Sequence, residues 1–333
     1  AAVMDDKGKI YWANANGVVK AFTDGGKQLW SFNAGSKVFS TPAIHENKLV
    51  FGATDGTIFC LDKESGNLLW KTAAKKSVLG SPTINNNLVY IGASDNIFRA
   101  LDVNSGIPVW EFTGVKSFVE SKPYVDSDGV YFGSWGSTFY KLQPQTGELL
   151  WSWTNNKGRG LSPAAVWPLV ANGKVFIATP ERMTHAIDTK TGKELWRAKG
   201  GRESVGLSPD KNTLYIKTMQ DTVFAYSTKA DTMSRVWTSH TGYGYEIAPS
   251  PTTAAYGYVF VPTDKGNIFV LKEKDGSLAG VIPFSGALIN LVDPVGNNKI
   301  LVSSMDGRVA LLEIPSKNFL SKEIKPDPKG KRK

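Results

Sequence analysis

Few residues in this 333-residue chain have the types and spacing that catalysis needs. The single cysteine, Cys60, would need a histidine beside it to act as a nucleophile, and a lone cysteine excludes an internal disulfide or a multi-cysteine metal site. The three histidines show no metal-ligand spacing such as H-x-x-x-H. We expect His45 in a turn, His185 on a strand and His240 in a connecting loop. The sequence therefore predicts a protein that is not an enzyme and has no cofactor or metal.

Five aspartates recur at the same place in successive segments and are the remaining candidates for chemistry. We interpret them as turn residues whose carboxylates bond their own backbone. The alternative is a ring of carboxylates that faces a ligand. The five are Asp55, Asp95, Asp221, Asp264 and Asp306.

A recurring tryptophan indicates the elements that would position any site. The spacings between the six tryptophans are 40, 40, 41, 45 and 41 residues, and each of the first five ends a G-x-x-x-W segment such as GNLLW (66–70). The last ends SRVW, where the glycine is missing. We predict that each ring wedges against the next repeat and that the glycine permits a bend that a Cβ would obstruct. The six are Trp30, Trp70, Trp110, Trp151, Trp196 and Trp237.

Each repeat of about 40 residues divides into four short apolar stretches with polar turns between them. In the second repeat, Asp55-Gly56 separates two such stretches, which is a strong hairpin signal. A single four-stranded sheet cannot bury both faces, whereas sheets stacked around an axis cover one another. We predict an all-β, eight-bladed β-propeller of four-stranded antiparallel blades, with seven blades as the alternative. Blades end near the six tryptophans, near Ala279 and at a C-terminal strand. Residues 1–316 form one domain, and 317–333 hold the last strand and a basic disordered tail.

These repeats, GKQLW, GNLLW, GIPVW, GELLW and GKELW after Asp-x-x-x-Gly-like turns, resemble the PQQ-type (tryptophan-docking) β-propeller repeat family along essentially the whole chain. Quinoprotein dehydrogenases of that family use a pair of adjacent cysteines, which Cys60 alone cannot form. Eight blades in a chain of this length resemble its envelope scaffold members. The resemblance implies a non-catalytic, protein-binding scaffold of the bacterial envelope, periplasmic or at the cell surface, with a lipid anchor lost before Ala1. The alternative is a ligand-binding or sensor domain fused to a kinase, phosphoesterase or surface module.

The net charge of +9 is concentrated at the C-terminal end. Residues 317–333 carry seven basic and two acidic side chains, or +5, which leaves +4 for the preceding 316 residues. We interpret the tail as a solvated end and expect no nucleic-acid partner. Membrane contact is expected only through a lipid anchor or a partner.

The best predicted binding surface is one rim of the propeller, which collects the connections between blades and the Asp-Gly turns. Function in such folds is carried by loops on a rigid scaffold. The repeat pattern breaks at 153–167, 179–185 and 239–246, and all three segments are predicted on this rim. The candidate partner-binding residues are Lys157, Arg159, Arg182, Arg202, Glu120, Glu203, Glu246, Tyr243 and Tyr245.

Overall fold

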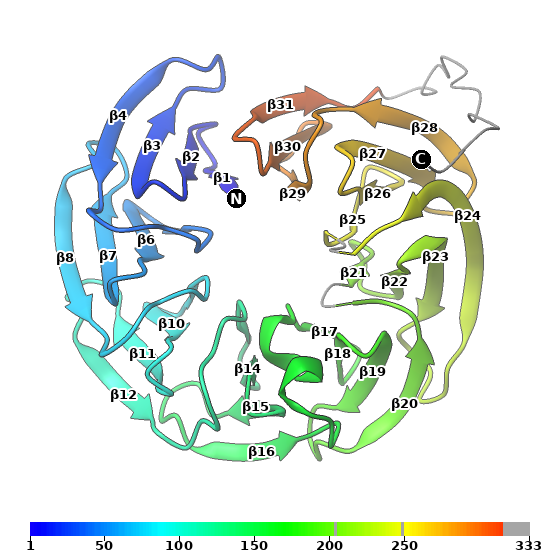
Figure 1. Ribbon diagram of the computed structural model, residues 1–333, viewed down its shortest axis with the longest axis horizontal. Coiled ribbons are helices and arrows are strands. Elements are labelled where there is room, and N and C mark those ends of the chain that lie inside the picture. The colour runs from blue at the N-terminus through cyan, green and yellow to red at the C-terminus, as the bar shows by residue number, and fades with distance from the viewer. Residues whose placement is uncertain (203–204, 248–249, 316–333) are drawn as a thin grey trace, which may run out of the picture.

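The computed structural model describes residues 1–202, 205–247 and 250–315. Figure 1 shows eight antiparallel sheets arranged in chain order as a ring around a central axis. Seven sheets have four strands, and the eighth has three within the described residues. The predicted eight-bladed propeller is confirmed and the seven-bladed alternative is wrong. The proposed fourth strand of the last blade, KNFLSKEI, and the basic tail lie outside the described residues.

The first four blades each run from an inner strand near the axis to an outer strand at the circumference (Figure 1). Blade one contains β1 (Ala2–Met4), β2 (Ile10–Ala13), β3 (Val18–Phe22) and β4 (Gln28–Asn33). Blade two contains β5 (Ala43–His45), β6 (Lys48–Gly52), β7 (Thr57–Asp62) and β8 (Leu68–Ala73). Blade three contains β9 (Thr83–Asn85), β10 (Leu88–Gly92), β11 (Phe98–Asp102) and β12 (Pro108–Phe112). Blade four contains β13 (Tyr124–Val125), β14 (Val130–Ser134), β15 (Thr138–Leu142) and β16 (Leu149–Trp153).

The second half of the ring follows the same order after two short 3-10 helices, η1 (Arg159–Leu161) and η2 (Pro163–Ala165). Blade five contains β17 (Leu169–Ala171), β18 (Lys174–Thr179), β19 (Met183–Asp188) and β20 (Glu194–Lys199). Blade six contains β21 (Gly206–Leu207), β22 (Thr213–Lys217), β23 (Gln220–Ser227) and β24 (Arg235–Tyr245). Blade seven contains β25 (Thr253–Ala255), β26 (Tyr258–Pro262), β27 (Asn267–Lys272) and β28 (Leu278–Pro283). Blade eight contains β29 (Ile289–Pro294), β30 (Lys299–Ser304) and β31 (Val309–Glu313).

The hydrophobic core is divided among the spaces between blades. Between blades two and three, for example, Ile58 and Cys60 pack with Val89 and Leu101, and all four are buried. The ring closes where Ala2 and Ile10 of blade one meet Leu301 of blade eight. Cys60 is therefore a packing residue, and burial raises the pKa of its thiol to about 12.

The repeating tryptophan docks onto the following blade. The indole of Trp70 donates from Nε1 to the carbonyl oxygen of Val103 at 2.9 Å, and its ring covers Gly106. A Cβ on Gly106 would stand 2.5 Å from that ring, and Gly106 has a φ of +72°. The glycine therefore has two roles, the left-handed turn and the space for the ring of the preceding blade. The sequence predicted only the first of these.

Blade six departs from this arrangement. The connection at 239–246 was expected to be a loop, but residues up to Tyr245 extend β24 to 11 residues. His240 accordingly lies on a strand, where its Nδ1 is 3.2 Å from the hydroxyl oxygen of Thr222. The turn before β24 lacks the docking glycine. The Nε1 of Trp196, which faces this turn from blade five, has no hydrogen-bond partner among the described residues. No helix in the described ranges is long and apolar enough to cross a membrane.

Candidate functional site

The blade connections and the turns between the second and third strands of each blade form one rim, as predicted. Backbone hydrogen bonds join the two kinds of loop in successive blades, from Thr54 N to Lys37 O at 2.9 Å and from Ser94 N to Ser77 O at 2.8 Å. These bonds tie each turn to the preceding connection, so the rim is a fixed surface rather than a set of separate loops.

The insertion between blades four and five places η1 and η2 on this rim. The carbonyl oxygen of Pro163 occupies the place of a Cβ on Gly133, only 1.7 Å from where that atom would stand. The insertion therefore lies directly on blade four because position 133 has no side chain. Lys157 is exposed, and its carbonyl oxygen accepts a hydrogen bond from Ser137 Oγ at 2.7 Å. Arg159 is the first residue of η1.

The long turn of blade five presents Arg182 to solvent. Arg182 has a φ of 64°, and its carbonyl oxygen accepts a hydrogen bond from Gly200 N at 2.8 Å. A groove of about 370 Å³ opens beside it between blades five and six. Arg182, Lys199 and Arg235 line this groove together with Met219 and Phe224, and no acidic residue is among its lining residues in the described chain.

The guanidinium of Arg235 is held in place within the groove. Its Cζ lies 4.5 Å from the ring centroid of Phe224 and 5.5 Å from that of Tyr226. Nη2 also donates to the Tyr226 hydroxyl at 3.0 Å. These two ring contacts and the hydrogen bond fix the guanidinium, and Arg235 remains exposed, so its free N–H groups can bind a ligand.

Two of the predicted rim residues are buried, which corrects their assignment to an accessible surface. Glu246 is 0% exposed and forms an ion pair with Lys217, which is 1% exposed. Tyr243 is 4% exposed, and its hydroxyl lies 2.7 Å from Thr218 O and 3.0 Å from Thr222 O. The ammonium of Lys217 lies over the Tyr243 ring at 5.0 Å and donates to Pro262 O at 2.5 Å. Glu246 and Tyr243 thus join blades six and seven instead of facing a partner.

The ionisation of this cluster follows from its burial. Loss of hydration raises the pKa of the Glu246 carboxyl, although Lys217 and the backbone N–H of Asp264 favour its charged form. Loss of hydration also lowers the pKa of the Lys217 ammonium, against the attraction of Glu246. Asp264 Oδ1 is buried without a hydrogen-bond partner in the described residues. Each charge of the ion pair therefore depends on the other.

The other candidates occupy different surroundings. Tyr245 is 52% exposed at the end of β24. Arg202 is half-buried and donates from Nη1 to Ile247 O at 2.7 Å. Glu120 is half-buried and accepts a hydrogen bond from Trp135 Nε1 at 2.8 Å. Glu203 lies outside the described residues. Lys157, Arg182 and Tyr245 are thus the candidates that the structure shows as exposed to solvent.

The recurring aspartates have unlike roles. Asp55 and Asp95 accept hydrogen bonds from backbone N–H groups two residues ahead, as the turn interpretation predicts. Asp95 also pairs with Arg99. Asp306 accepts from Ser304 Oγ and also from the backbone of Arg308, two residues ahead. In contrast, Asp221 accepts from the distant Gly244 N. The turn interpretation is wrong for Asp221.

The histidines are separated from one another. His45 ends strand β5, where it is 3.0 Å from Asn87 Oδ1, so its expected place in a turn is wrong. His185 lies on β19 as expected, buried, with Nδ1 2.6 Å from Glu194 Oε2. Within the described ranges, no three metal-ligating side chains form a group that could hold a metal ion.

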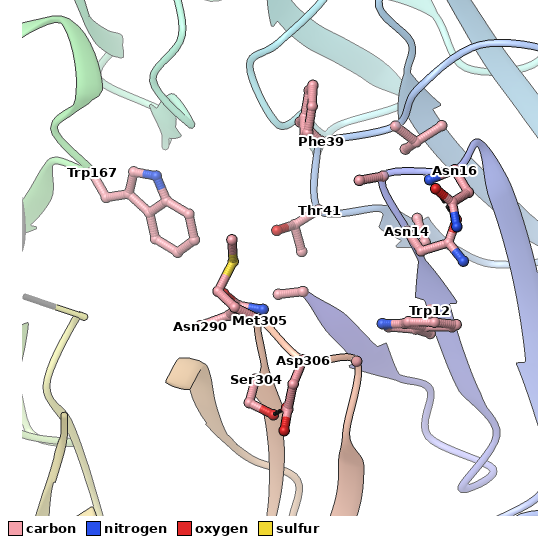
Figure 2. Close-up of a pocket in the computed structure, with 15 residues that line it drawn as sticks. Trp12, Asn14, Asn16, Phe39, Thr41, Trp167, Asn290, Ser304, Met305 and Asp306 are labelled. Carbon is pink, nitrogen blue, oxygen red and sulfur yellow. Dashed lines mark hydrogen bonds between the residues drawn. The ribbon is translucent and has the colours of Figure 1, made fainter. Parts of the chain in front are cut away.

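A second hollow, about 520 Å³, lies at the mouth of the central channel and was not predicted from the sequence. Figure 2 shows Trp12 and Trp167 on opposite sides of it, with Phe39 at its edge and Met305 between the two tryptophans. Phe39 is 55% exposed and Met305 is 70% exposed. Trp167 ends the segment 153–167 whose irregular spacing the sequence revealed, whereas Trp12 and Phe39 stand in segments of regular length.

The fold and rim define the class of the molecule, an eight-bladed β-propeller built from tryptophan-docking repeats. Residues 15–229 and 140–328 match the family described as "Outer membrane protein assembly factor BamB". The chain belongs to this family.

A curated relative agrees with this assignment. "Outer membrane protein assembly factor BamB" of Moranella endobia (strain PCIT) is 26% identical over 165 residues, which are 45% of this chain and 40% of that protein. The match thus spans less than half the length of that curated relative.

Three solved structures share the fold. BamB from Moraxella catarrhalis has a TM-score of 0.80 at 18% identity, covering 94% of this chain and 96% of that chain. The computationally designed Ika8 protein has a TM-score of 0.79 at 18% identity, covering 94% and 95%. Saccharomyces cerevisiae Sqt1 has a TM-score of 0.78 at 14% identity, covering 93% and 94%. At these identities the likeness establishes the fold alone.

Proposed function

We propose that this protein is a non-catalytic scaffold of the bacterial cell envelope that binds a protein partner in outer-membrane assembly, at the periplasmic side of the outer membrane. Family membership supports the location and the process. The groove between blades five and six supports the binding surface, because it places Arg182, Lys199 and the fixed guanidinium of Arg235 around apolar Met219 and Phe224. Such a combination of cations and buried apolar area is typical of protein interfaces.

The exposed neighbours of the groove extend the same surface. Tyr245 is 52% exposed and Ile247 is 61% exposed, and Ile247 is joined to Arg202 through its carbonyl oxygen. An aromatic ring and an aliphatic side chain beside fixed cations would supply anchors for a partner. The connection that carries Lys157 contacts the blade-five turn, because Asn155 Nδ2 donates to Glu181 Oε1 at 3.3 Å. The proposed contact surface therefore consists of Lys157, Arg182, Lys199, Arg235, Tyr245 and Ile247.

The test is crosslinking of the tagged full-length protein in its own bacterium, followed by identification of partners from the envelope fraction. A variant with Lys157→Glu, Arg182→Glu and Lys199→Glu reverses three exposed charges on the proposed surface. We expect it to lose an outer-membrane assembly partner that the unaltered protein captures, with an unchanged melting temperature.

Lys190→Glu is the matched control, because Lys190 is exposed in the turn between β19 and β20, on the opposite rim of blade five. This variant should retain the partner. Equal capture by the triple variant would refute the proposed surface. Capture of components unconnected with outer-membrane assembly alone would refute the proposed process.

A further inference from the structure

We propose that the hollow at the mouth of the central channel, bounded by Trp12, Phe39 and Trp167, is a binding site for a neutral oligosaccharide. This assignment goes beyond the scaffold function and does not depend on it. The hollow lies at the inner ends of blades eight, one and two, away from the groove between blades five and six.

The size and shape of the hollow suit a small ligand. Its volume of about 520 Å³ lies within the range of small-molecule sites, roughly 300–1,000 Å³. Trp167 reaches it from the far side of the ring, after the insertion that follows blade four, and Figure 2 shows its ring across the space from Trp12. The insertion therefore closes one side of a hollow whose other side belongs to blades eight, one and two.

The aromatic side chains provide the apolar part of the site. Phe39 is 55% exposed at the edge of the hollow, and Trp12 and Trp167 are half-buried in its walls. Flat aromatic faces attract the C–H faces of sugar rings through dispersion and burial. Lys122 Nζ lies 5.6 Å from the ring centroid of Trp167, so a neighbouring cation helps to hold that ring.

The polar side chains of the hollow are mainly amides and hydroxyls. Asn14, Asn16 and Asn290 line it together with Thr41 and Ser304. A side-chain amide both donates and accepts hydrogen bonds, as a sugar hydroxyl does. The carboxamide oxygen of Asn14 accepts from Asn16 N and Val18 N, each at 3.0 Å, which fixes the side chain and directs its NH₂ group outward from that turn.

The charge of the lining favours a neutral ligand. No Lys, Arg or His side chain in the described residues lines the hollow. Its one acidic side chain, Asp306, accepts a hydrogen bond from Ser304 Oγ and lies 3.4 Å from Arg308 Nε. Two cations lie just outside the lining, Lys122 over the ring of Trp167 and Arg308 beside Asp306, so the walls themselves offer mainly amides and hydroxyls, which match sugar hydroxyls.

The experiment uses three neutral probes, the β-1,4-linked tetramer of N-acetylglucosamine, cellotetraose and maltotetraose. Saturation-transfer NMR and calorimetry on the purified chain should show binding of at least one probe. Phe39→Ala should weaken it about tenfold, because it removes an exposed ring without disturbing the core. Trp167→Leu should abolish it, and Trp167→Phe should restore part of it.

Leu69→Ala is the matched control, because Leu69 is 49% exposed on an outer strand distant from the channel, and it should bind as the unaltered protein does. Absence of binding by all three probes at about 10 mM, above the millimolar Kd of a weak site, would overturn the proposal. Unchanged binding by Phe39→Ala would do the same. A neutral tryptophan- and proline-containing peptide that binds when no saccharide does would reassign the site to a protein ligand and also overturn it.

Discussion

Blades two and three meet through apolar contacts, whereas blades six and seven add a buried ion pair to an apolar cluster of their own. In blade two the last residue of β6 is Gly52, and a Cβ there would overlap the side chain of Val78. The corresponding last residue of β22 in blade six is Lys217, whose partner from the next connection is Glu246. Both positions have the same register in their blades, since Gly52 pairs with Ile58 and Lys217 with Val223, two residues before Cys60 and Ala225.

The difference indicates how one repeat can serve stability in one region and recognition in another. The contact between Gly52 and Val78 is apolar and leaves no space for a larger side chain at position 52, so it is a pure packing contact. A buried ion pair adds little net stability, because both charges lose their hydration. It does require its two residues to stay together, since either charge alone would be buried without a partner. Glu246 belongs to the irregular segment 239–246, and its backbone N donates at 3.0 Å to the carbonyl oxygen of Met219, which lines the groove. We infer that it holds the irregular connection of blade six in the one arrangement that forms the groove.

The largest expected effect comes from the docking tryptophans. Trp110→Ala should reduce the free energy of unfolding by about 3–5 kcal/mol, as for other buried tryptophans. Trp196→Ala should cost about 1 kcal/mol less, because its Nε1 makes no hydrogen bond in the described residues, while Trp110 Nε1 donates to Pro144 O at 2.9 Å. Urea titration followed by circular dichroism measures both. Equal losses would show that the docking hydrogen bond adds nothing.

The next largest effect concerns the buried pair and depends on pH. Lys217→Met removes the cation that lowers the pKa of Glu246, so this pKa, already raised by burial, should rise further. An acid with a raised folded pKa binds more protons in the folded than in the unfolded state, so stability falls as pH rises above the unfolded value. The variant should lose about 3 kcal/mol at pH 8 and less at pH 5.

A second substitution isolates the charge in this variant. Adding Glu246→Leu to Lys217→Met removes the stranded carboxyl, so the double variant should recover stability at pH 8 and lose the pH dependence. Urea midpoints at the two pH values provide the measurement. A double variant as unstable as the single one would mean that packing, and not the uncompensated charge, causes the loss.

The glycines of the docking motif separate backbone strain from packing. Gly106→Ala should cost about 2–4 kcal/mol, since a left-handed φ of +72° and a Cβ 2.5 Å from the Trp70 ring both oppose it. Gly35→Ala is the matched control, because Gly35 has a φ of +73° and no atom within 4 Å of its Cβ position. It should cost about 1 kcal/mol. Similar losses for the two variants would assign the whole effect to the backbone.

The sequence predicted the parts of the fold that repeat. The G-x-x-x-W segment occurs five times, and each occurrence marks the same packing contact between neighbouring blades, so its spacing predicts the blades. The burial of Glu246 could not be predicted in this way. Its partner Lys217 is recognised as the equivalent of Gly52 only from the strand register, which the sequence does not show. Gly and Tyr residues at 239–246 suggested a loop, but pairing of Gln220 with Tyr245 extends the strand. Trp12 and Phe39 come together with Trp167 only through closure of the ring.

The smallest expected effect tests whether blade six opens more often than blade two. Cys60 and Ala225 occupy equivalent buried positions, each opposite the docking tryptophan of its own blade. With its pKa raised to about 12, the Cys60 thiol should resist alkylation until blade two opens. In the variant Cys60→Ala with Ala225→Cys, the single thiol reports on blade six instead.

Blade six receives Trp196 without a docking hydrogen bond in the described residues, whereas blade two receives Trp30, whose Nε1 donates to Lys63 O at 2.9 Å. One such bond is worth about 1 kcal/mol, so the thiol at position 225 should be alkylated about fivefold faster under native conditions. Equal rates for the two proteins, with equal global stability, would show that the ring opens as one unit and that its two regions differ in composition but not in local stability.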